Sequence, residues 1–412
     1  MKWISTRSKS KSVSTLEAIS VGLAPDGGLF VPSMMPVGIV PYRESIAEFA
    51  VEFLKPFFEG ENCDLAGICA RAFNFEILVR ELKGGPSVLE LFHGPTNAFK
   101  DFAARFLAEL LGSVTQVPRT VLVATSGDTG GAVASAFFRQ KNFRVVILFP
   151  KGKISDRQFK QLTSFGENVQ AFAVNGSFDD CQALVKKAFT DPRFAGLHLL
   201  SANSINIARI LPQAIYYAHT SLVEKDCTFV IPTGNLGNAV AALWAKKMGY
   251  PIKKIVFACN QNQTLPDYFR TGAYTPGATV HTLANAMDVS APSNFERLQS
   301  LYPTLDDLKK DCEIFSASDD EIRATVRSVY LKYRYAVCPH TATAFSAFKK
   351  LGIEDAVLVA TAHPAKFESV VEPILGVKLD VPQGLADILS RPSRFTDLDG
   401  SFEDFSTKLL DG

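Results

Sequence analysis

Net charge and long apolar runs are both nearly absent from this sequence. Its 412 residues carry a formal net charge of only +1, which argues against the basic surface of a nucleic-acid-binding protein. No apolar run reaches the ~18 residues that a membrane span requires. The N-terminal stretch MKWISTRSKSKSVSTLEA also lacks the apolar segment of a secretory signal. We therefore expect neither nucleic acid nor a membrane as a partner.

Cysteine is scarce as well, and its positions are scattered. An odd number of cysteines without any CxxC pair predicts free thiols in a reducing cytosol and no metal site. The Ser-rich, basic N-terminus also resembles an organelle transit peptide, but it continues directly into sequence that looks ordered. We therefore expect a cytoplasmic protein. The cysteines are Cys63, Cys69, Cys181, Cys227, Cys259, Cys312 and Cys338.

What the sequence does contain is enough apolar material for more than one core. Hydrophobic residues make up 47% and charged residues 21%, and the length suits two or three domains. Residues 1–85 combine the turn-rich stretch GLAPDGGLFVP with segments of helical apolar spacing. From residue 86 onward, apolar strands alternate with helices, which predicts βαβ units and a largely parallel sheet. The C-terminal stretch is polar and poorly periodic.

A single lysine, Lys100, lies where irregular chain is predicted to become a helix. Gly94 and Pro95 break regular structure before it, and apolar residues recur at helical spacing after it, with Asp101 on the charged outer face. A lysine at a helix start lies at the positive end of the macrodipole, which lowers the amine's pKa and favours the nucleophilic neutral form. Judged on local sequence alone, a solvated loop lysine is the simpler interpretation.

Two Gly-rich turns each follow an apolar strand and precede a helix. They are TSGDTGGA (Thr125–Ala132) and TGNLGNA (Thr233–Ala239). Such turns expose backbone N–H groups at a helix N-terminus, which suits phosphate or carboxylate, near the strand ends where α/β proteins bind ligands. Neither matches GxGxxG or GxxxxGK(S/T), so they do not indicate a dinucleotide or a nucleoside triphosphate. One such loop is as easily a tight structural turn, but two of them beside Lys100 favour a binding site.

Together these motifs resemble the threonine synthase family, in the bacterial and fungal class that has an N-terminal extension. FHGPTNAFKDF is similar to that family's pyridoxal-phosphate lysine motif, ATSGDTGGA to its substrate loop and PTGNLGN to its cofactor-phosphate loop. The resemblance extends from about Ser5 to Phe367. Other similar segments are STRSKSKSVSTLEAISVGLAPDGGLFVP, SANSINIARILPQ, AMDVSAPSNFERL and TAHPAKF.

The resemblance implies the tryptophan-synthase-β-like α/β fold, type II of the pyridoxal-phosphate enzymes. This fold has two open parallel-sheet α/β domains, here with an N-terminal extension domain. The implied extension covers residues 1–85. A smaller domain, 86–222, would carry the cofactor lysine and the substrate loop, and a larger one, 223–412, the cofactor-phosphate loop. A monomer or a homodimer is expected.

The implied activity is that of a carbon–oxygen lyase that acts on phosphates with pyridoxal 5'-phosphate as cofactor. Such an enzyme converts O-phospho-L-homoserine and water to L-threonine and phosphate, by γ-elimination and β-addition, in the last step of threonine biosynthesis. The alternatives are a serine or threonine dehydratase and a catalytically silent homologue. The extension and the SANSINIAR segment favour the synthase, because a dehydratase substrate carries no phosphate.

The same resemblance implies a role for each site residue. Lys100 would bind the cofactor covalently and remove the Cα and Cβ protons of the substrate, and the hydroxyl of Thr361 would meet the pyridine nitrogen. The remaining assignments are Gly234, Asn235, Leu236, Gly237 and Asn238 for the cofactor phosphate, Asp128 for the cofactor ring, Ser126 and Thr129 for the substrate carboxylate, and Asn203, Ser204 and Arg209 for the substrate phosphate.

Several of these residues have alternative interpretations. Some relatives have Asn at the position of Asp128, where the amide meets the cofactor ring oxygen, so an Asp there is expected to be protonated or turned away. Arg209 has the alternative of extending into solvent. Gly237 is expected to bring backbone close to a phosphate, with positive φ as one option. His93 could be catalytic, but His93 and His340 are equally well interpreted as hydrogen-bonded structural residues.

Overall fold

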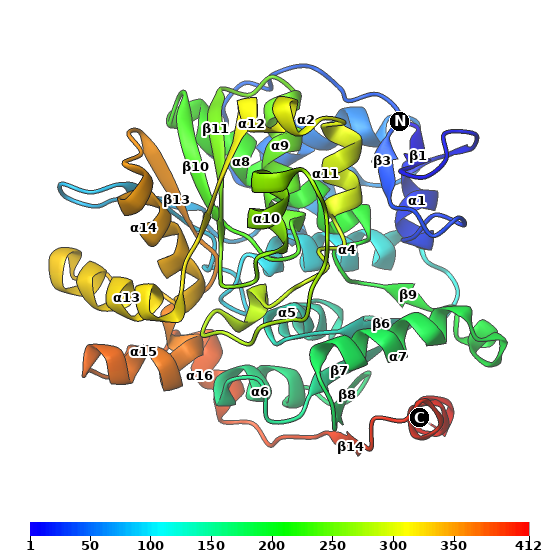
Figure 1. Ribbon diagram of the computed structural model, residues 1–412. Coiled ribbons are helices and arrows are strands. Elements are labelled where there is room, and N and C mark those ends of the chain that lie inside the picture. The colour runs from blue at the N-terminus through cyan, green and yellow to red at the C-terminus, as the bar shows by residue number, and fades with distance from the viewer. Residues whose placement is uncertain (412) are drawn as a thin grey trace.

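Three β-sheets organise the computed structural model, which describes residues 1–411 (Figure 1). The smallest sheet is antiparallel, has the strand order β2-β1-β3 and is built by the N-terminal segment. The predicted turn is confirmed, because Gly27 has a φ of +76° and a short strand follows it. The elements of this part are β1 (Trp3–Ser5), β2 (Ser12–Val13), α1 (Thr15–Val21), β3 (Phe30–Pro32), α2 (Ile46–Phe58) and α3 (Leu65–Ala72).

A six-stranded sheet of order β12-β11-β10-β13-β5-β4 forms much of the upper part of the molecule in Figure 1. All of its neighbouring strands are parallel except the edge strand β4. Its strands are β4 (Leu78–Glu81), β5 (Ser87–Glu90), β10 (Cys227–Pro232), β11 (Ile252–Cys259), β12 (Cys312–Ser316) and β13 (Ala356–Ala360). The helices of this part of the chain are α8 (Leu211–Val223), α9 (Gly237–Lys247), α10 (Thr264–Thr271), α11 (Phe295–Leu301), α12 (Leu305–Asp311), α13 (Asp319–Tyr333), α14 (Pro339–Leu351) and α15 (Glu368–Leu375).

A five-stranded, wholly parallel sheet of order β14-β8-β7-β6-β9 lies below it. Its central strands are almost entirely buried, as expected for parallel strands covered by helices. The two open sheets confirm the predicted α/β class. The strands are β6 (Arg119–Ala124), β7 (Phe143–Pro150), β8 (Val169–Val174), β9 (Leu200–Ser201) and β14 (Thr396–Leu398), and the helices α4 (Lys100–Val114), α5 (Asp128–Phe137), α6 (Asp156–Thr163), α7 (Phe178–Thr190), α16 (Gln383–Leu389) and α17 (Phe402–Asp411).

Three strands pair outside the unit to which the sequence-based division assigns them. β4, from residues 1–85, pairs with β5, and β5 pairs with β13 of the six-stranded sheet. β14 pairs with β8 of the five-stranded sheet. α17 follows β14 in the stretch where the sequence showed no clear periodicity, and it buries Phe405 and Leu409. The C-terminal part of the chain thus returns to the lower sheet, while the division into domains stays a prediction.

Helix α4 begins at Lys100, as the sequence predicts, and its apolar side lies in the main core. The predicted position of Asp101 on the outer face is wrong, because this residue is only 1% exposed. Its carboxylate accepts hydrogen bonds from the backbone N–H (2.9 Å) and the hydroxyl (2.6 Å) of Thr96. These bonds fix the irregular segment just before Lys100, so the start of the helix has a defined position.

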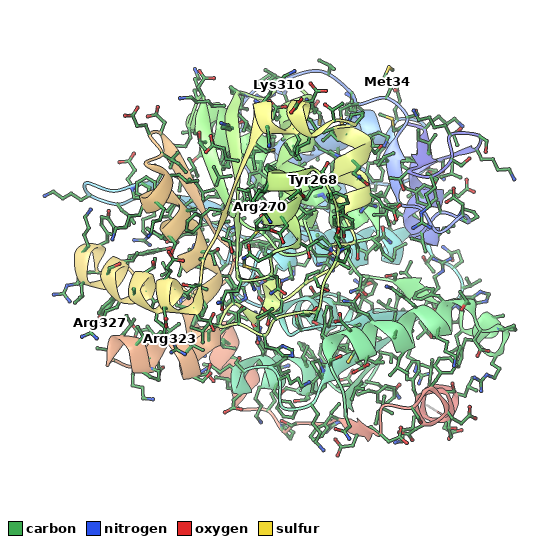
Figure 2. All side chains as sticks on the ribbon, viewed as in Figure 1. Met34, Tyr268, Arg270, Lys310, Arg323 and Arg327 are labelled. Carbon is green, nitrogen blue, oxygen red and sulfur yellow. The ribbon has the colours of Figure 1, made fainter. Side chains whose placement is uncertain are left out.

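Helix α13 has one buried and one exposed side. Ile322, Val326 and Val329 are buried, whereas Arg323 and Arg327 lie on the outer side of the helix (Figure 2). The two arginines are four residues apart and therefore share one face. The buried side of this helix belongs to a hydrophobic cluster that also contains residues of the six-stranded sheet.

Residues 1–411 contain no candidate membrane span and no candidate metal site. No helix in that range combines the length and the apolarity needed to cross a bilayer. No three His, Cys, Asp or Glu side chains of these residues are grouped so that they would hold a metal ion. All seven cysteines are free, and six of them are buried.

Candidate active site

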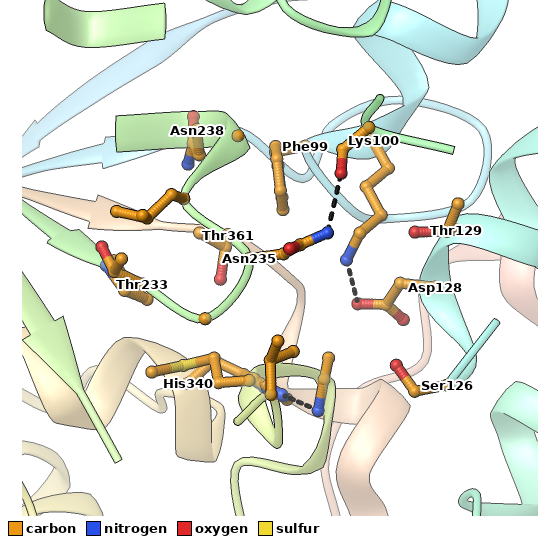
Figure 3. A pocket seen from close by; sticks show the side chains of 18 of the residues that line it. Phe99, Lys100, Ser126, Asp128, Thr129, Thr233, Asn235, Asn238, His340 and Thr361 are labelled. Atoms are coloured by element: carbon orange, nitrogen blue, oxygen red, sulfur yellow. Dashed lines mark hydrogen bonds and ion pairs between the residues drawn. The ribbon is translucent and has the colours of Figure 1, made fainter. Parts of the chain in front are cut away.

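One cavity, lined by segments from both large sheets, collects the chemically distinctive residues of the chain (Figure 3). Its wall consists largely of residues that follow the carboxyl ends of β6, β9, β10 and β13, which is where open parallel sheets bind ligands. The structure brings every predicted site residue together here, while their individual roles stay predictions. They are Lys100, Ser126, Asp128, Thr129, Asn203, Ser204, Arg209, Gly234, Asn235, Leu236, Gly237, Asn238 and Thr361.

Lys100 is the first residue of α4, and its side chain is 16% exposed at the cavity wall. Its Nζ atom lies 4.0 Å from Oδ2 of Asp128 (Figure 3). Burial lowers the pKa of this amine to about 8, although the Asp128 carboxylate acts in the opposite direction. The predicted lowering of the pKa of Lys100 is confirmed, but its main cause is desolvation rather than the helix macrodipole. The interpretation as a solvated loop lysine is therefore wrong.

Asp128 carries a negative charge that a second lysine balances. Its Oδ1 atom lies 2.9 Å from Nζ of Lys366 and accepts a hydrogen bond of 2.9 Å from Nε2 of Gln158. Burial alone would raise the pKa of Asp128, but Lys366 and then Lys100 hold it well below its usual range. These two amines favour an ionised Asp128 over the protonated alternative. Lys366, which is fully buried, also donates to the carbonyl oxygen of Thr96 (2.7 Å).

The loop between β10 and α9 has the geometry of an anion cradle. Leu236 has a φ of +63°, and α9 then begins at Gly237 without a side chain that caps its first N–H groups. Such uncapped N–H groups bind phosphate readily. At Gly234 an added Cβ would lie 2.7 Å from Cα of Met287, so a side chain does not fit there. The positive φ considered for Gly237 is wrong, because Leu236 makes that turn.

The start of α5, at Asp128, is a second helix N-terminus in the same cavity. Gly127 has a φ of +129°, and the hydroxyl of Thr125 accepts the N–H groups of Gly127 (3.0 Å) and Gly130 (2.9 Å). The N–H groups of Asp128 and Thr129 have no side-chain cap. Ser126 and Thr129 lie on either side of this turn, so their hydroxyls accompany its backbone N–H groups at the cavity wall (Figure 3). Hydroxyls beside exposed N–H groups suit a carboxylate.

Arg209 is buried in the loop that follows β9. It is 2% exposed, its Nη1 donates to the carbonyl of Ala202 (2.7 Å), and its Nε has no partner among residues 1–411. The alternative in which it extends into solvent is therefore wrong. The nearby Ser204 hydroxyl accepts bonds from Nδ2 of Asn235 (2.8 Å) and of Asn294 (3.1 Å), so its own hydrogen can be donated to a ligand. A guanidinium with a donating hydroxyl suits phosphate.

Two residues of the site gave no local signal in the sequence. His340 lines the cavity: its Nε2 accepts from the N–H of Ala286 (3.1 Å), and its buried Nδ1 has no partner among the described residues. Burial lowers the pKa of His340 to about 4, so the ring is neutral at physiological pH. Lys366 lies within TAHPAKF, but only folding brings it to the cavity carboxylate. His93, in contrast, lies outside this cavity and bonds to Glu90 (2.8 Å), which fits a structural role.

The cavity fits the cofactor that the resemblance implies. It offers an amine of lowered pKa, an uncapped helix start behind a glycine, and the hydroxyl of Thr361. The carbonyl of Thr361 accepts the N–H of Phe99 (2.9 Å), which fixes the Lys100 segment beside β13. The side chain of Asn238, which follows Gly237 in this loop, is fixed by the Tyr216 hydroxyl, which donates to its Oδ1 (2.5 Å).

Comparison with protein families agrees with this geometry. A family model described as "Pyridoxal-phosphate dependent enzyme" matches residues 87–362, which is more than half of the chain. Models described as "Threonine synthase N terminus" and "Threonine synthase, C-terminal" match residues 2–73 and 340–407. The two end matches carry the synthase description, so they favour the synthase over the dehydratase alternative.

Individual relatives lead to the same result over the full length of the chain. A threonine synthase of Serratia marcescens is 40% identical over 100% of this chain and 99% of the relative. The crystal structure of threonine synthase from Escherichia coli has a TM-score of 0.92 and 36% identity and covers both chains completely. The pyridoxal-phosphate-bound threonine synthase from Brucella melitensis has a TM-score of 0.92 and 34% identity, covering 100% of this chain and 99% of that one. These matches confirm the type II fold and the pyridoxal-phosphate cofactor.

Proposed function

Because this chain belongs to the threonine synthase family of pyridoxal-phosphate enzymes, we propose that it converts O-phospho-L-homoserine and water to L-threonine and inorganic phosphate. The observation that supports this reaction best is the presence of two separate anion sites in the cavity of Lys100. One is the uncapped start of α9, and the other contains Ser204 and the buried Arg209. A phosphorylated substrate and a phosphorylated cofactor need two such sites, whereas a dehydratase needs only one.

Lys100 moves the protons in this proposal. When bound, pyridoxal phosphate supplies an electron sink that stabilises negative charge at carbons near the substrate nitrogen. The neutral Nζ of Lys100 takes the Cα proton, passes it on within the conjugated system and, neutral again, takes one from Cβ, after which phosphate leaves from Cγ. The hydroxyl of water then bonds to Cβ, protons return to Cγ and Cα, and the second proton of water accompanies the phosphate. A pKa of about 8 suits both halves of this exchange, because both protonation states are accessible near neutral pH.

The other residues bind and orient. Ser126 and Thr129 hold the substrate carboxylate, and the neutral hydroxyl of Thr361 meets the pyridine nitrogen without keeping it protonated. The ionised Asp128 does not itself suit a ring oxyanion. Its partner Lys366 supplies the positive charge that such an oxygen requires, and the carboxylate keeps that amine in place (2.9 Å).

The proposal includes the setting in which the enzyme works. We place it in the cytoplasm, where a reducing environment fits its free cysteines. We expect it to be a monomer or a homodimer. We keep the division into an extension (1–85), a smaller domain (86–222) and a larger domain (223–412). β4 and β5 then complete the sheet of the larger domain, and β14 completes that of the smaller domain.

The test is a product balance with the purified holoprotein. O-phospho-L-homoserine should yield phosphate and threonine in equal amounts. A colorimetric assay measures the phosphate, and amino-acid analysis measures the threonine. The control is threonine as substrate, with 2-oxobutanoate as the product measured. Faster deamination of threonine than consumption of O-phosphohomoserine would favour a dehydratase, and no turnover of either would favour a silent homologue.

A further inference from the structure

One buried arginine, Arg297, connects the N-terminal extension to the substrate-phosphate loop. It lies on α11 and is 0% exposed. Its Nε donates to the carbonyl of Phe30 on β3 (3.1 Å). On the other side, Nη1 donates to the carbonyl of Ser204 (2.9 Å) and Nη2 to that of Ile205 (2.5 Å). The fork of this guanidinium thus joins two segments that are more than 170 residues apart in sequence.

No carboxylate of residues 1–411 forms an ion pair with this buried charge, and only the adjacent Glu296 favours the charged form from a distance. Within residues 1–411 its hydrogen-bond partners are three backbone carbonyls and the side-chain oxygen of Asn294 (2.6 Å). The adjacent Glu296 pairs instead with Arg7 (2.5 Å) and Thr6 (2.9 Å) at the surface of the extension. Burial lowers the pKa of Arg297, because the charged form loses its hydration. A buried cation without a counter-ion is unfavourable for stability and suits a neighbouring anion.

Asn294 extends this connection to both anion sites. Its Oδ1 is held by Arg297, which leaves Nδ2 to donate to the Ser204 hydroxyl (3.1 Å) and to the carbonyl of Asn235 (3.1 Å). A second tie lies nearby, where Nδ2 of Asn206 donates to the carbonyl of Ile19 at the end of α1 (2.9 Å). The extension therefore holds the loop that carries Ser204 at two points.

We propose that Arg297 is a positioning residue for the substrate phosphate. It fixes the backbone at Ser204 and Ile205 against β3, orients the Ser204 hydroxyl through Asn294, and adds positive charge close to the anion. This inference rests on the proposed function, which assigns the substrate phosphate to Ser204 and Arg209. It gives the N-terminal extension a role in substrate binding, as the fixed support of the phosphate loop.

The test uses two variants and a matched control in the holoprotein. Arg297→Met removes the charge and all four hydrogen bonds, and Arg297→Lys keeps the charge but loses the fork. Glu296→Gln is the control, because it weakens a contact between the same helix and the extension at the surface. KM and kcat for O-phosphohomoserine, the inhibition constant of inorganic phosphate, the near-visible cofactor absorbance and the thermal midpoint are measured for each.

Arg297→Met should raise both KM and the inhibition constant of phosphate about tenfold, as expected when charge-assisted positioning of a bound anion is lost. kcat should fall by a smaller factor, and the cofactor absorbance should persist. Arg297→Lys should lie between this variant and the parent. Glu296→Gln should keep both constants within about twofold of the parent, since its charge lies at the surface.

Two results would overturn the inference. One is a phosphate inhibition constant within about twofold of the parent in both Arg297 variants; if the Met variant does not fold, the Lys variant decides alone. The other is an equal loss of cofactor and phosphate affinity, which would make Arg297 a general support of the fold.

Arg209→Ala separates this inference from the proposed function. Phosphate inhibition that is unchanged in Arg209→Ala refutes the site itself, whereas an effect at Arg209 without one at Arg297 refutes only the positioning role.

Discussion

The two anion sites of the cavity are built in different ways. The proposed cofactor-phosphate loop, residues 234–238, contains no charged side chain and offers backbone N–H groups at the start of α9. The proposed substrate-phosphate site depends on the side chains of Arg209 and Ser204, and the distant Asn294 and Arg297 donate to the hydroxyl and the carbonyl of Ser204. A backbone cradle is a local structure, whereas a side-chain site needs contacts between distant segments. Each site should therefore respond to its own set of substitutions.

The largest expected effect is that of Lys100→Ala, which removes the amine that works beside both sites. Threonine formation should fall by at least about a thousandfold, because covalent binding of the cofactor and proton transfer are both lost. Inorganic phosphate should still raise the thermal midpoint, since neither anion site contains the lysine. Product analysis and a thermal melt test this. Near-normal threonine formation would falsify the role of Lys100.

Arg209→Ala should break the substrate site and leave the cofactor site intact. The loss of a charge-assisted contact of ~1.5–3 kcal/mol predicts an affinity for O-phosphohomoserine that is roughly ten to a hundred times lower. Steady-state kinetics and competitive inhibition by phosphate measure it. The near-visible absorbance of the cofactor serves as the internal control. Its disappearance together with activity would mean that the two sites are not separate.

The glycines of the cofactor loop should differ from each other. At Gly234 a Cβ would lie 2.7 Å from backbone of Met287, whereas at Gly237 its nearest neighbours are side-chain atoms at 3.4 Å. Gly234→Ala should therefore weaken cofactor binding about tenfold, because the cradle must shift, and Gly237→Ala by a smaller factor. Cofactor titration of the apo forms of both variants gives the two dissociation constants. Equal constants would contradict this description of the loop.

The same contrast explains how far the sequence could predict the structure. The alternation of strands and helices, the two Gly-rich turns and the helix start at Lys100 follow from short stretches of sequence. Asp101 was misplaced because its position fits the outer face of a helix, but Thr96 binds its carboxylate in the interior. α17 was missed since its few buried residues need the surface of the distant lower sheet.

The site shows the same limit. Motifs identified the residues that line the cavity, whereas the pairing of Asp128 with Lys366 joins positions 238 residues apart and left no local pattern. Arg297 lies in a segment that resembles the family, but nothing in its spacing predicts that it would bond to Phe30. The contribution of charge inside the cavity therefore becomes visible only in the folded chain.

The smallest expected effect concerns that charge pair and the amine beside it. Asp128 raises the pKa of Lys100 and Lys366 lowers it, while burial sets its value near 8. Lys366→Met removes a like charge, so the pKa of Lys100 should move up. Asp128→Asn removes the attracting carboxylate and leaves Lys366 unbalanced, so the pKa should move down. Each shift should be of the order of one pH unit.

Competitive acetylation of the apo-protein with acetic anhydride measures this pKa, because only the neutral amine reacts. The labelled fraction of the Lys100 peptide is followed by mass spectrometry against pH, with the exposed Lys332 as internal reference. Either single variant leaves an unbalanced buried charge, which destabilises a fold by ~3–5 kcal/mol. The double variant Asp128→Asn/Lys366→Met removes both charges, so it should be more stable than either single variant. Its titration midpoint for Lys100 should lie between those of the two single variants. Shifts of the same sign in the two single variants would show that the pair does not set the protonation of Lys100. Another group would then set the protonation of Lys100. The contrast between a neutral cradle and charged side chains would apply only to the two phosphate sites.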